Sequence, residues 1–182
     1  DLVNQRVAAV FIEPRAVLAH YDPHTEQMTV WASTQAPHGL RTGIATALDF
    51  PEHAIRVIAP DVGGGFGSKG GLYPEYLFAA AASLKLGRPV KWVETRSEHF
   101  VATNHGRDQL QHLEVAVRAD GTLDALRVKV LYNCGAYNGA TVGQRTGTMS
   151  TGPYRISNLR ADVYGVMTNT TPTGAYRGAG RP

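Results

Sequence analysis

A run of nine residues, 63–71, contains six glycines, and it limits what the chain can form more than any other feature. Glycine inside a helix or strand costs roughly 0.5–1 kcal/mol relative to alanine, so the run favours a loop with exposed backbone. It follows a β-prone segment, 54–59, and precedes an alanine- and leucine-rich segment, 75–86. Pro74 is typical of a first helical turn and Gly87 of a helix C-terminus. We therefore predict a buried strand, a glycine loop and a helix in succession.

Such a loop can bring its backbone N–H groups close to a ligand, beside the positive end of the following helix. A phosphate-bearing cofactor is the first interpretation. The loop is not a Walker A loop, since Ser68 and Gly70 stand where that motif needs glycine and a hydroxyl residue. Residues 65–70 do satisfy the G-x-G-x-x-G pattern of an NAD-binding Rossmann fold, with Glu94 as the ribose ligand.

Two features count against the Rossmann interpretation. The predicted helix begins beyond the third glycine, and Phe66 is bulky where the turn should be tight. In the other interpretations Glu94 is an ordinary charge at the end of a strand. The NAD-binding alternative stays open at this point, as does a glycine-rich turn that binds nothing.

The remaining elements mix strands and helices without strict alternation, which predicts the α+β class with mixed sheets and helices. We predict β-hairpins over 16–21 with 27–33 and 109–117 with 123–132, strands over 90–95 and 162–167, and a helix over 38–49. Glycines recur at every fourth position from Gly135 to Gly147. This spacing allows close helix packing, but the polar residues in between favour a loop over 134–152.

Composition excludes several classes of protein. Of the 182 residues, 43% are hydrophobic and 18% are charged, which is typical of one globular domain and not of a disordered chain. No apolar run approaches the roughly 18 residues of a membrane span. The single cysteine, Cys134, forms neither an internal disulfide nor a cysteine-based zinc site. The formal charge of +3 comes from scattered arginines without a recognisable motif, so we expect no nucleic-acid partner.

Motifs of hydrolytic and zinc-dependent catalysis are also missing. The seven histidines form no H-E-x-x-H, and we expect His99 and His105 to be structural or solvated. His112 begins an H-x-E sequence, but one cysteine cannot supply the P-C-x-x-C of a zinc deaminase. A G-x-S-x-G elbow is absent, which argues against a hydrolase.

Three segments resemble successive cofactor-contacting segments of one family when they are taken together. They are 33–38 (STQAPH), 61–69 (DVGGGFGSK) and 174–182 (GAYRGAGRP). Their order and spacing are similar to those in the molybdenum-binding large subunit of the xanthine dehydrogenase family. The carbon monoxide dehydrogenase and aldehyde oxidoreductase branches are the most similar by motif.

The resemblance implies a molybdenum hydroxylase that binds molybdopterin and hydroxylates an aldehyde or an N-heterocycle, or oxidises CO. It implies a small-molecule substrate, iron–sulfur and FAD subunits or domains as partners, and no direct protein ligand to the metal. Whether the pterin is the cytosine dinucleotide form stays open. Gln35 matches the glutamine whose amide donates to the oxo group. The other matching residues are Gly65, Phe66 and Gly67, whose loop N–H groups approach the metal ligands, and Arg177 and Gly178, which line the other side.

The chain also departs from the family pattern. Gly70 follows Lys69 where purine-oxidising members carry a substrate-recognising glutamate, so xanthine is not the expected substrate. The family's general-base glutamate lies farther toward the C-terminus, so the catalytic residue is unknown in this chain. Glu13 lies in a family-like segment that implies no catalytic role.

The ends of the chain suggest an excised piece, since it begins without methionine and stops directly after a glycine-rich segment. We therefore expect residues 1–182 to be a partial molybdopterin-binding domain, truncated at both ends, from a cytoplasmic enzyme. Such a piece is expected to be inactive alone. An inert cofactor cradle is the non-enzyme alternative.

Overall fold

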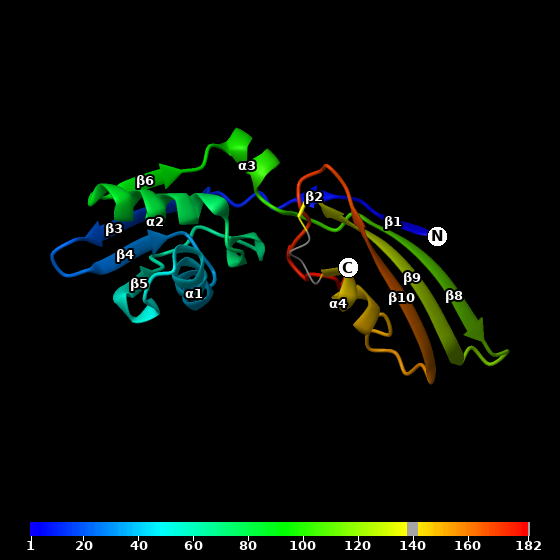
Figure 1. The fold of residues 1–182 in the computed structure, drawn as a ribbon. Coiled ribbons are helices and arrows are strands. Elements are labelled where there is room, and N and C mark those ends of the chain that lie inside the picture. The colour runs from blue at the N-terminus through cyan, green and yellow to red at the C-terminus, as the bar shows by residue number, and fades with distance from the viewer. Residues whose placement is uncertain (138–141, 182) are drawn as a thin grey trace. The chain divides into compact units, whose positions relative to one another are not determined.

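The computed structural model describes residues 1–137 and 142–181, and the chain forms two compact units (Figure 1). The first, Val10–Val101, is called here the glycine-loop unit. The second combines Asp1–Ala9 with Ala102–Pro182 and is called the long-strand unit. Each unit combines a four-stranded sheet with at least one α-helix, which confirms the predicted α+β class. None of the helices in the described residues has the length and apolar character needed to cross a bilayer.

The sheet of the glycine-loop unit has the strand order β5-β4-β3-β6. β3 (Ala16–Asp22) and β4 (Gln27–Ala32) form the predicted antiparallel hairpin. β5 (Ile55–Ile58), which follows the 3₁₀ turn η1 (Glu52–Ala54), pairs parallel with β4, while β6 (Val90–Val93) pairs antiparallel with β3. Both lie inside their predicted ranges. β5 was predicted to be a buried strand, but only its first residue is buried.

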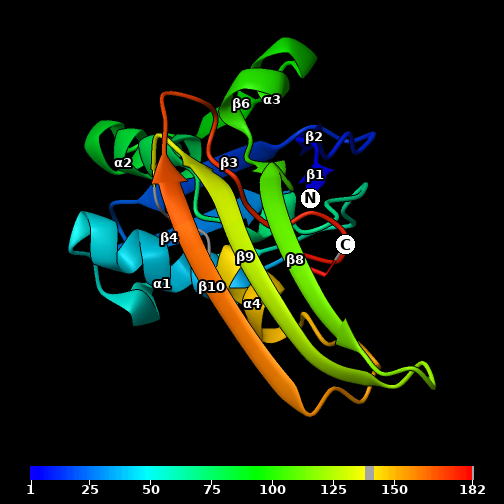
Figure 2. The same ribbon diagram turned by 90° about the vertical axis from the view of Figure 1, so that its right-hand side faces the viewer.

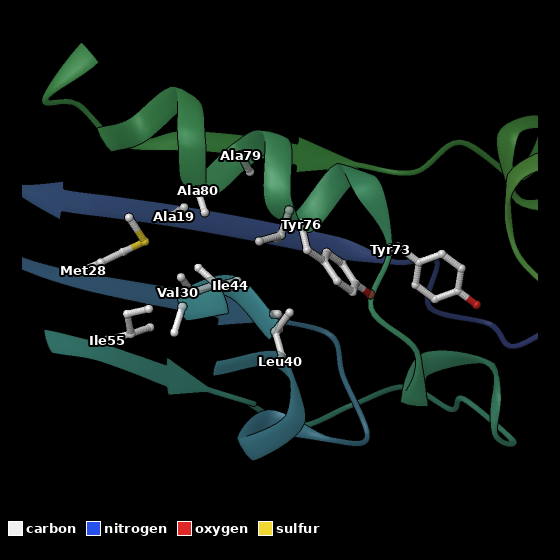
Figure 3. Packing of buried hydrophobic residues seen from close by; sticks show 13 residues of the cluster. Ala19, Met28, Val30, Leu40, Ile44, Ile55, Tyr73, Tyr76, Ala79 and Ala80 are labelled. Atoms are coloured by element: carbon white, nitrogen blue, oxygen red, sulfur yellow. The ribbon is translucent and has the colours of Figure 1, made fainter. Parts of the chain in front are cut away.

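Two helices pack on this sheet and enclose the core (Figure 3). α1 (Pro37–Leu48) and α2 (Pro74–Leu86) each begin with proline, and Gly87 ends α2 in the left-handed conformation, with φ 59°. These bounds confirm both predicted helices. Figure 3 shows Tyr76 of α2 and Ile44 of α1 within the cluster of buried residues. The cluster consists of Val17, Ala19, Met28, Val30, Ala32, Leu40, Ile44, Ala45, Ile55, Tyr73, Tyr76, Ala79 and Ala80.

A buried ion cluster surrounds Arg15, which precedes β3 and is 0% exposed. Its guanidinium donates to Glu94 Oε1 from Nε at 2.9 Å and from Nη2 at 2.6 Å, and to Glu75 Oε2 of α2 from Nη1 at 3.1 Å. His99 of α3 (Arg96–Ala102) places Nδ1 3.1 Å from Glu94 Oε2. The expected structural role of His99 is therefore confirmed. Glu94 is not an ordinary charge at a strand end, because its carboxylate lies inside this cluster.

The long-strand unit has a sheet of order β1-β8-β9-β10, whose three long strands lie side by side (Figure 2). β8 and β9 form the predicted antiparallel hairpin, and β10 pairs parallel with β9. Leu126, Val128 and Val130 of β9 are buried, as their alternation predicts. β10 begins earlier than predicted. The strands of this unit are β1 (Leu2–Asn4), β8 (Gln109–Val117), β9 (Leu123–Gly135) and β10 (Asn158–Met167), with a separate pair, β2 (Val7–Ala8) and β7 (His105–Gly106).

A short helix, α4 (Val142–Thr148), lies within the segment predicted as a loop, so that prediction is wrong there. The reason is packing against the sheet. A Cβ on Gly143 would lie 2.1 Å from Cδ1 of Tyr132, and one on Gly147 would lie 2.6 Å from Cγ2 of Val163. Glycine lets the helix approach the strands closely, which is the alternative that the spacing allowed. Gly139 lies outside the described residues.

We expect Glu94→Ala to destabilise the protein strongly, because it leaves the buried Arg15 guanidinium with part of its charge unpaired. The free energy of unfolding should fall by about 3–5 kcal/mol, measured by urea denaturation. Glu52→Ala is the control, since it breaks the Arg41–Glu52 pair, whose side chains are 42% and 41% exposed. Its loss should be about 1 kcal/mol or less, and equal losses would contradict the buried role of Glu94.

A methyl group on α4 should also be costly. Gly143→Ala forces the helix away from Tyr132, and we expect a loss of about 1–3 kcal/mol in thermal unfolding. Gly39→Ala on α1 is the control, because its Cβ would meet only Ala36 Cβ, at 3.8 Å. That change should be neutral or stabilising by up to about 1 kcal/mol. If Gly143→Ala unfolds at the same temperature as the wild type, the close contact between α4 and Tyr132 does not contribute to stability.

Candidate functional site

The glycine loop occupies the chain between β5 and α2, as predicted, and it ends in the 3₁₀ turn η2 (Ser68–Gly70). Gly64, Phe66 and Gly67 have φ angles of 95°, 51° and 103°. Positive φ is accessible to glycine, but it is strained for a bulky residue such as phenylalanine. The ring of Phe66 is 46% exposed. The loop therefore holds Phe66 in a conformation that its own preferences disfavour.

Gln35 connects the loop to the turn between β4 and α1. Its side-chain Oε1 accepts a hydrogen bond from the Gly67 N–H at 2.8 Å, and its backbone N–H donates to the Lys69 carbonyl at 3.0 Å. Because an N–H needs an acceptor, the amide oxygen must face the loop. The amide nitrogen Nε2 is then left as a donor. Two of the segments that carry the family resemblance are thus joined directly.

Most backbone N–H groups of the loop donate to acceptors inside the protein. These are Gly63 to Glu13, Gly64 to Val62, Gly67 to Gln35, Ser68 to Gly65 and Gly70 to Gly67. Within the described residues, the N–H groups of Gly65 and Phe66 make no hydrogen bond. Together with Gln35 Nε2 they are three neutral donors available to a ligand.

Gly65 has no room for a side chain. A Cβ at this position would lie 2.4 Å from Gln35 Oε1 and 2.8 Å from its Cδ. The φ of Gly65 is not positive, so the requirement for glycine comes from the neighbouring amide and not from the backbone. The identity of residue 65 therefore decides where the Gln35 amide lies.

Glu13 and Lys69 form an ion pair beside the loop, a structural role that was not predicted from the sequence. Lys69 is 0% exposed, and its Nζ lies 2.7 Å from Glu13 Oε2. Burial opposes ionisation of Glu13, but hydrogen bonds from Lys69, Ser33 and Gly63 outweigh it and lower the pKa of the carboxyl. A lysine in an otherwise glycine-rich loop was the available signal, because a buried ammonium requires an acidic partner.

Arg177 and Gly178 belong to the long-strand unit, whereas Gln35 and the glycine loop belong to the glycine-loop unit. Their φ angles are 26° and 101°. The Arg107 guanidinium donates to the carbonyls of Tyr176 and Arg177, the latter at 3.1 Å, and lies 4.9 Å from the centre of the Tyr176 ring. This arginine fixes the backbone of the second glycine-rich segment.

The structure contradicts the Rossmann interpretation. In a Rossmann fold the strand after the helix runs parallel beside the strand before it. Here β6 follows α2 but pairs antiparallel with β3, away from β5. The carboxylate of Glu94 is also buried against Arg15 and cannot accept ribose hydroxyls. Among the described residues, no three His, Cys, Asp or Glu side chains are grouped closely enough to hold a metal ion.

Comparisons with known proteins place the chain in a family. The family model described as the molybdopterin cofactor-binding domain matches residues 1–182. The gamma subunit of the 6-hydroxypseudooxynicotine dehydrogenase complex of Paenarthrobacter nicotinovorans is 38% identical over 182 residues, which cover 98% of this chain and 23% of that protein. The carbon monoxide dehydrogenase large chain of Hydrogenophaga pseudoflava is 38% identical over 177 residues, which cover 94% of this chain and 22% of that protein.

A solved structure is also similar to this chain. Quinoline 2-oxidoreductase from Pseudomonas putida 86 superposes with a TM-score of 0.93 and 38% identity, covering 98% of this chain and 23% of that one. The chain thus spans under a quarter of the length of these relatives. Since the family model matches all 182 residues, the chain belongs to the molybdopterin cofactor-binding domain family.

Proposed function

We propose that this chain is the cofactor-binding part of a molybdenum hydroxylase large subunit that oxidatively hydroxylates an aromatic N-heterocycle or an aldehyde. We further propose that residues 1–182 are a partial domain of that subunit. Family membership and the relatives named above support both statements. The relatives also include enzymes named for nicotine and nicotinate, which favours the N-heterocycle. CO is the less favoured substrate, since no cysteine lies near Arg177 in the sequence.

The observation that carries the proposal is the hydrogen bond between Gly67 and Gln35. It leaves Gln35 Nε2 as a donor, while the Gly65 and Phe66 N–H groups are also unpaired among the described residues. Rigidly held neutral donors suit the electron-rich ligand atoms of a molybdenum cofactor, because they stabilise negative charge without adding positive charge. The residues present therefore fit the cofactor that the family binds.

The cofactor supplies the oxidative chemistry when it is bound, and the protein supplies orientation. In this proposal Gln35 Nε2 and the Phe66 N–H donate hydrogen bonds to the cofactor. Gly67 contributes by holding the Gln35 amide, since its own N–H is occupied. The resemblance also assigns Arg177 and Gly178 to cofactor binding, in the segment that Arg107 fixes.

The electrons removed from the substrate must leave the cofactor, so we infer iron–sulfur and FAD partners. The relatives are named as a complex subunit, a large subunit and a large chain, which supports assembly with further subunits. Metal and phosphorus analysis of the intact protein from a molybdenum-competent host tests the cofactor. A dye-reduction assay with N-heterocycles, aldehydes and CO tests the substrate. Metal-free protein that binds NADH would overturn the proposal.

Gln35→Ala should lower kcat by about 10-fold or more in the intact enzyme, because one preorganised donor to the cofactor is lost. Rates are to be expressed per molybdenum atom, so that loss of cofactor and loss of turnover are separated. Gln27→Ala is the matched control, since Gln27 is exposed at the start of β4. Unchanged kinetics at full molybdenum loading would rule out the role of Gln35.

Gly65→Ala should disturb the same donor without removing it. The added methyl group displaces the Gln35 amide, so we expect lower kcat per molybdenum, with a stability loss of only about 1 kcal/mol for the hydrogen bond. Gly70→Ala is the control within the same loop, because no atom lies within 4 Å of its Cβ position and its φ is not positive. If Gly70→Ala lowers kcat as much as Gly65→Ala does, the loss does not come from displacement of the Gln35 amide.

A further inference from the structure

We propose that the ion pair between the buried Lys69 and the half-buried Glu13 is a positioning element, which holds the glycine loop and the Gln35 amide in the arrangement that the cofactor requires. The inference rests on the proposed function for its catalytic consequence. Its structural part concerns the loop alone. Neither residue is proposed to touch the cofactor or the substrate.

Glu13 ties three segments together through one oxygen atom. Its Oε2 accepts hydrogen bonds from the Ser33 hydroxyl, the Gly63 N–H and Lys69 Nζ, each at 2.7 Å. The Glu13 N–H also donates to the Gly63 carbonyl at 3.2 Å. Gly63 begins the glycine loop, Lys69 lies near its end, and Ser33 precedes Gln35 by two residues. One carboxylate thus holds both ends of the loop and the residue two positions before Gln35.

Lys69 extends this connection from its side chain to its main chain. The Lys69 carbonyl accepts hydrogen bonds from the Gln35 N–H at 3.0 Å and from the Thr34 hydroxyl at 3.1 Å. Two residues earlier, Gly67 donates to the Gln35 side chain. A shift of Lys69 would therefore move both the backbone and the amide of Gln35. The geometry gives the pair a direct mechanical connection to the proposed donor.

The charge of the pair is well suited to this role. Lys69 Nζ is enclosed, with the centre of the Phe11 ring 4.6 Å away. Burial lowers the pKa of Lys69, and the hydrogen bond to Glu13 opposes that effect. Removing the Glu13 carboxylate would leave the buried Lys69 ammonium without its partner, which is strongly unfavourable. Glu13 also balances the charge of Lys69, so the ion pair adds no net charge beside the neutral donors of the loop.

The test compares Lys69→Met and Glu13→Gln in the intact enzyme with Arg41→Met, a control in an exposed ion pair of the same unit. Lys69→Met keeps an unbranched side chain, one atom shorter, and removes its charge. We expect both test variants to lower kcat per molybdenum by about 10-fold or more, with a smaller change in KM. Arg41→Met should leave both values unchanged.

A double mutant separates positioning from general destabilisation. If Lys69 acts through Gln35, Lys69→Met should lower kcat per molybdenum much less in a Gln35→Ala background than in the wild type. Independent losses that multiply would overturn the proposal. Glu13→Gln provides the same comparison if Lys69→Met does not fold.

Hydrogen exchange measured by mass spectrometry tests the structural part without activity. Peptides covering 63–71 should exchange faster in Lys69→Met and Glu13→Gln than in the wild type, and peptides of β9 should not change. Unchanged exchange in the loop would overturn the positioning role, whatever cofactor is bound. If the loop exchanges faster in the variants but the wild-type protein contains no molybdenum, the positioning role is supported and the proposed function is contradicted.

Discussion

The guanidinium of Arg15 is the point on which the glycine-loop unit depends, because it joins elements that are distant in the sequence. Glu75 lies in the first turn of α2, Glu94 follows β6, and both carboxylates pair with this one side chain. The centre of the Tyr73 ring lies 3.9 Å from the guanidinium carbon, and the Tyr73 hydroxyl donates to the Ser68 carbonyl at 2.7 Å. The ion cluster therefore fixes the start of α2 and, through Tyr73, the end of the loop.

One aromatic ring, that of Phe11, lies between the Arg15 cluster and Lys69. It contacts His99 edge to face, with ring centres 4.6 Å apart, and the Lys69 ammonium lies 4.6 Å from its centre. His99 belongs to the Arg15 cluster and Lys69 to the glycine loop. Each of the two buried cations has a carboxylate partner within the unit, whereas the donors assigned to the cofactor, Gln35 Nε2 and the Phe66 N–H, are neutral. Separation of charge from the ligand-facing surface is the organising feature of this half of the chain.

The sequence predicts those parts of the fold that depend on neighbouring residues. Alternation identified β8 and β9, and Pro74 with Gly87 marked the ends of α2. The helix α4 could not be predicted from the sequence, because glycine lowers helix propensity and the compensating contact with Tyr132 is a tertiary one. The role of Glu94 was missed for the same reason, since its partner Arg15 is 79 residues away.

The candidate site shows the same division. Gln35 and the glycine loop were found through a resemblance across several segments, although each motif alone is short. Their direct contact spans 32 residues of sequence, and the Glu13–Lys69 pair spans 56. No local pattern encodes either distance. A loop with exposed backbone could be predicted from its glycines, but which N–H groups stay available depends on these partners.

The parallel pairing of β9 and β10 has a consequence for the order of folding. The hairpin of β8 and β9 closes over a short turn, whereas β10 can reach β9 only after the chain has crossed back through α4. Loop closure of this length is entropically slower than hairpin closure, and parallel strands cannot be joined by a tight turn. The hairpin should therefore form early in the long-strand unit and expose the edge of β9 until β10 arrives. A newly synthesised chain would be most prone to pairing with a second copy during that interval.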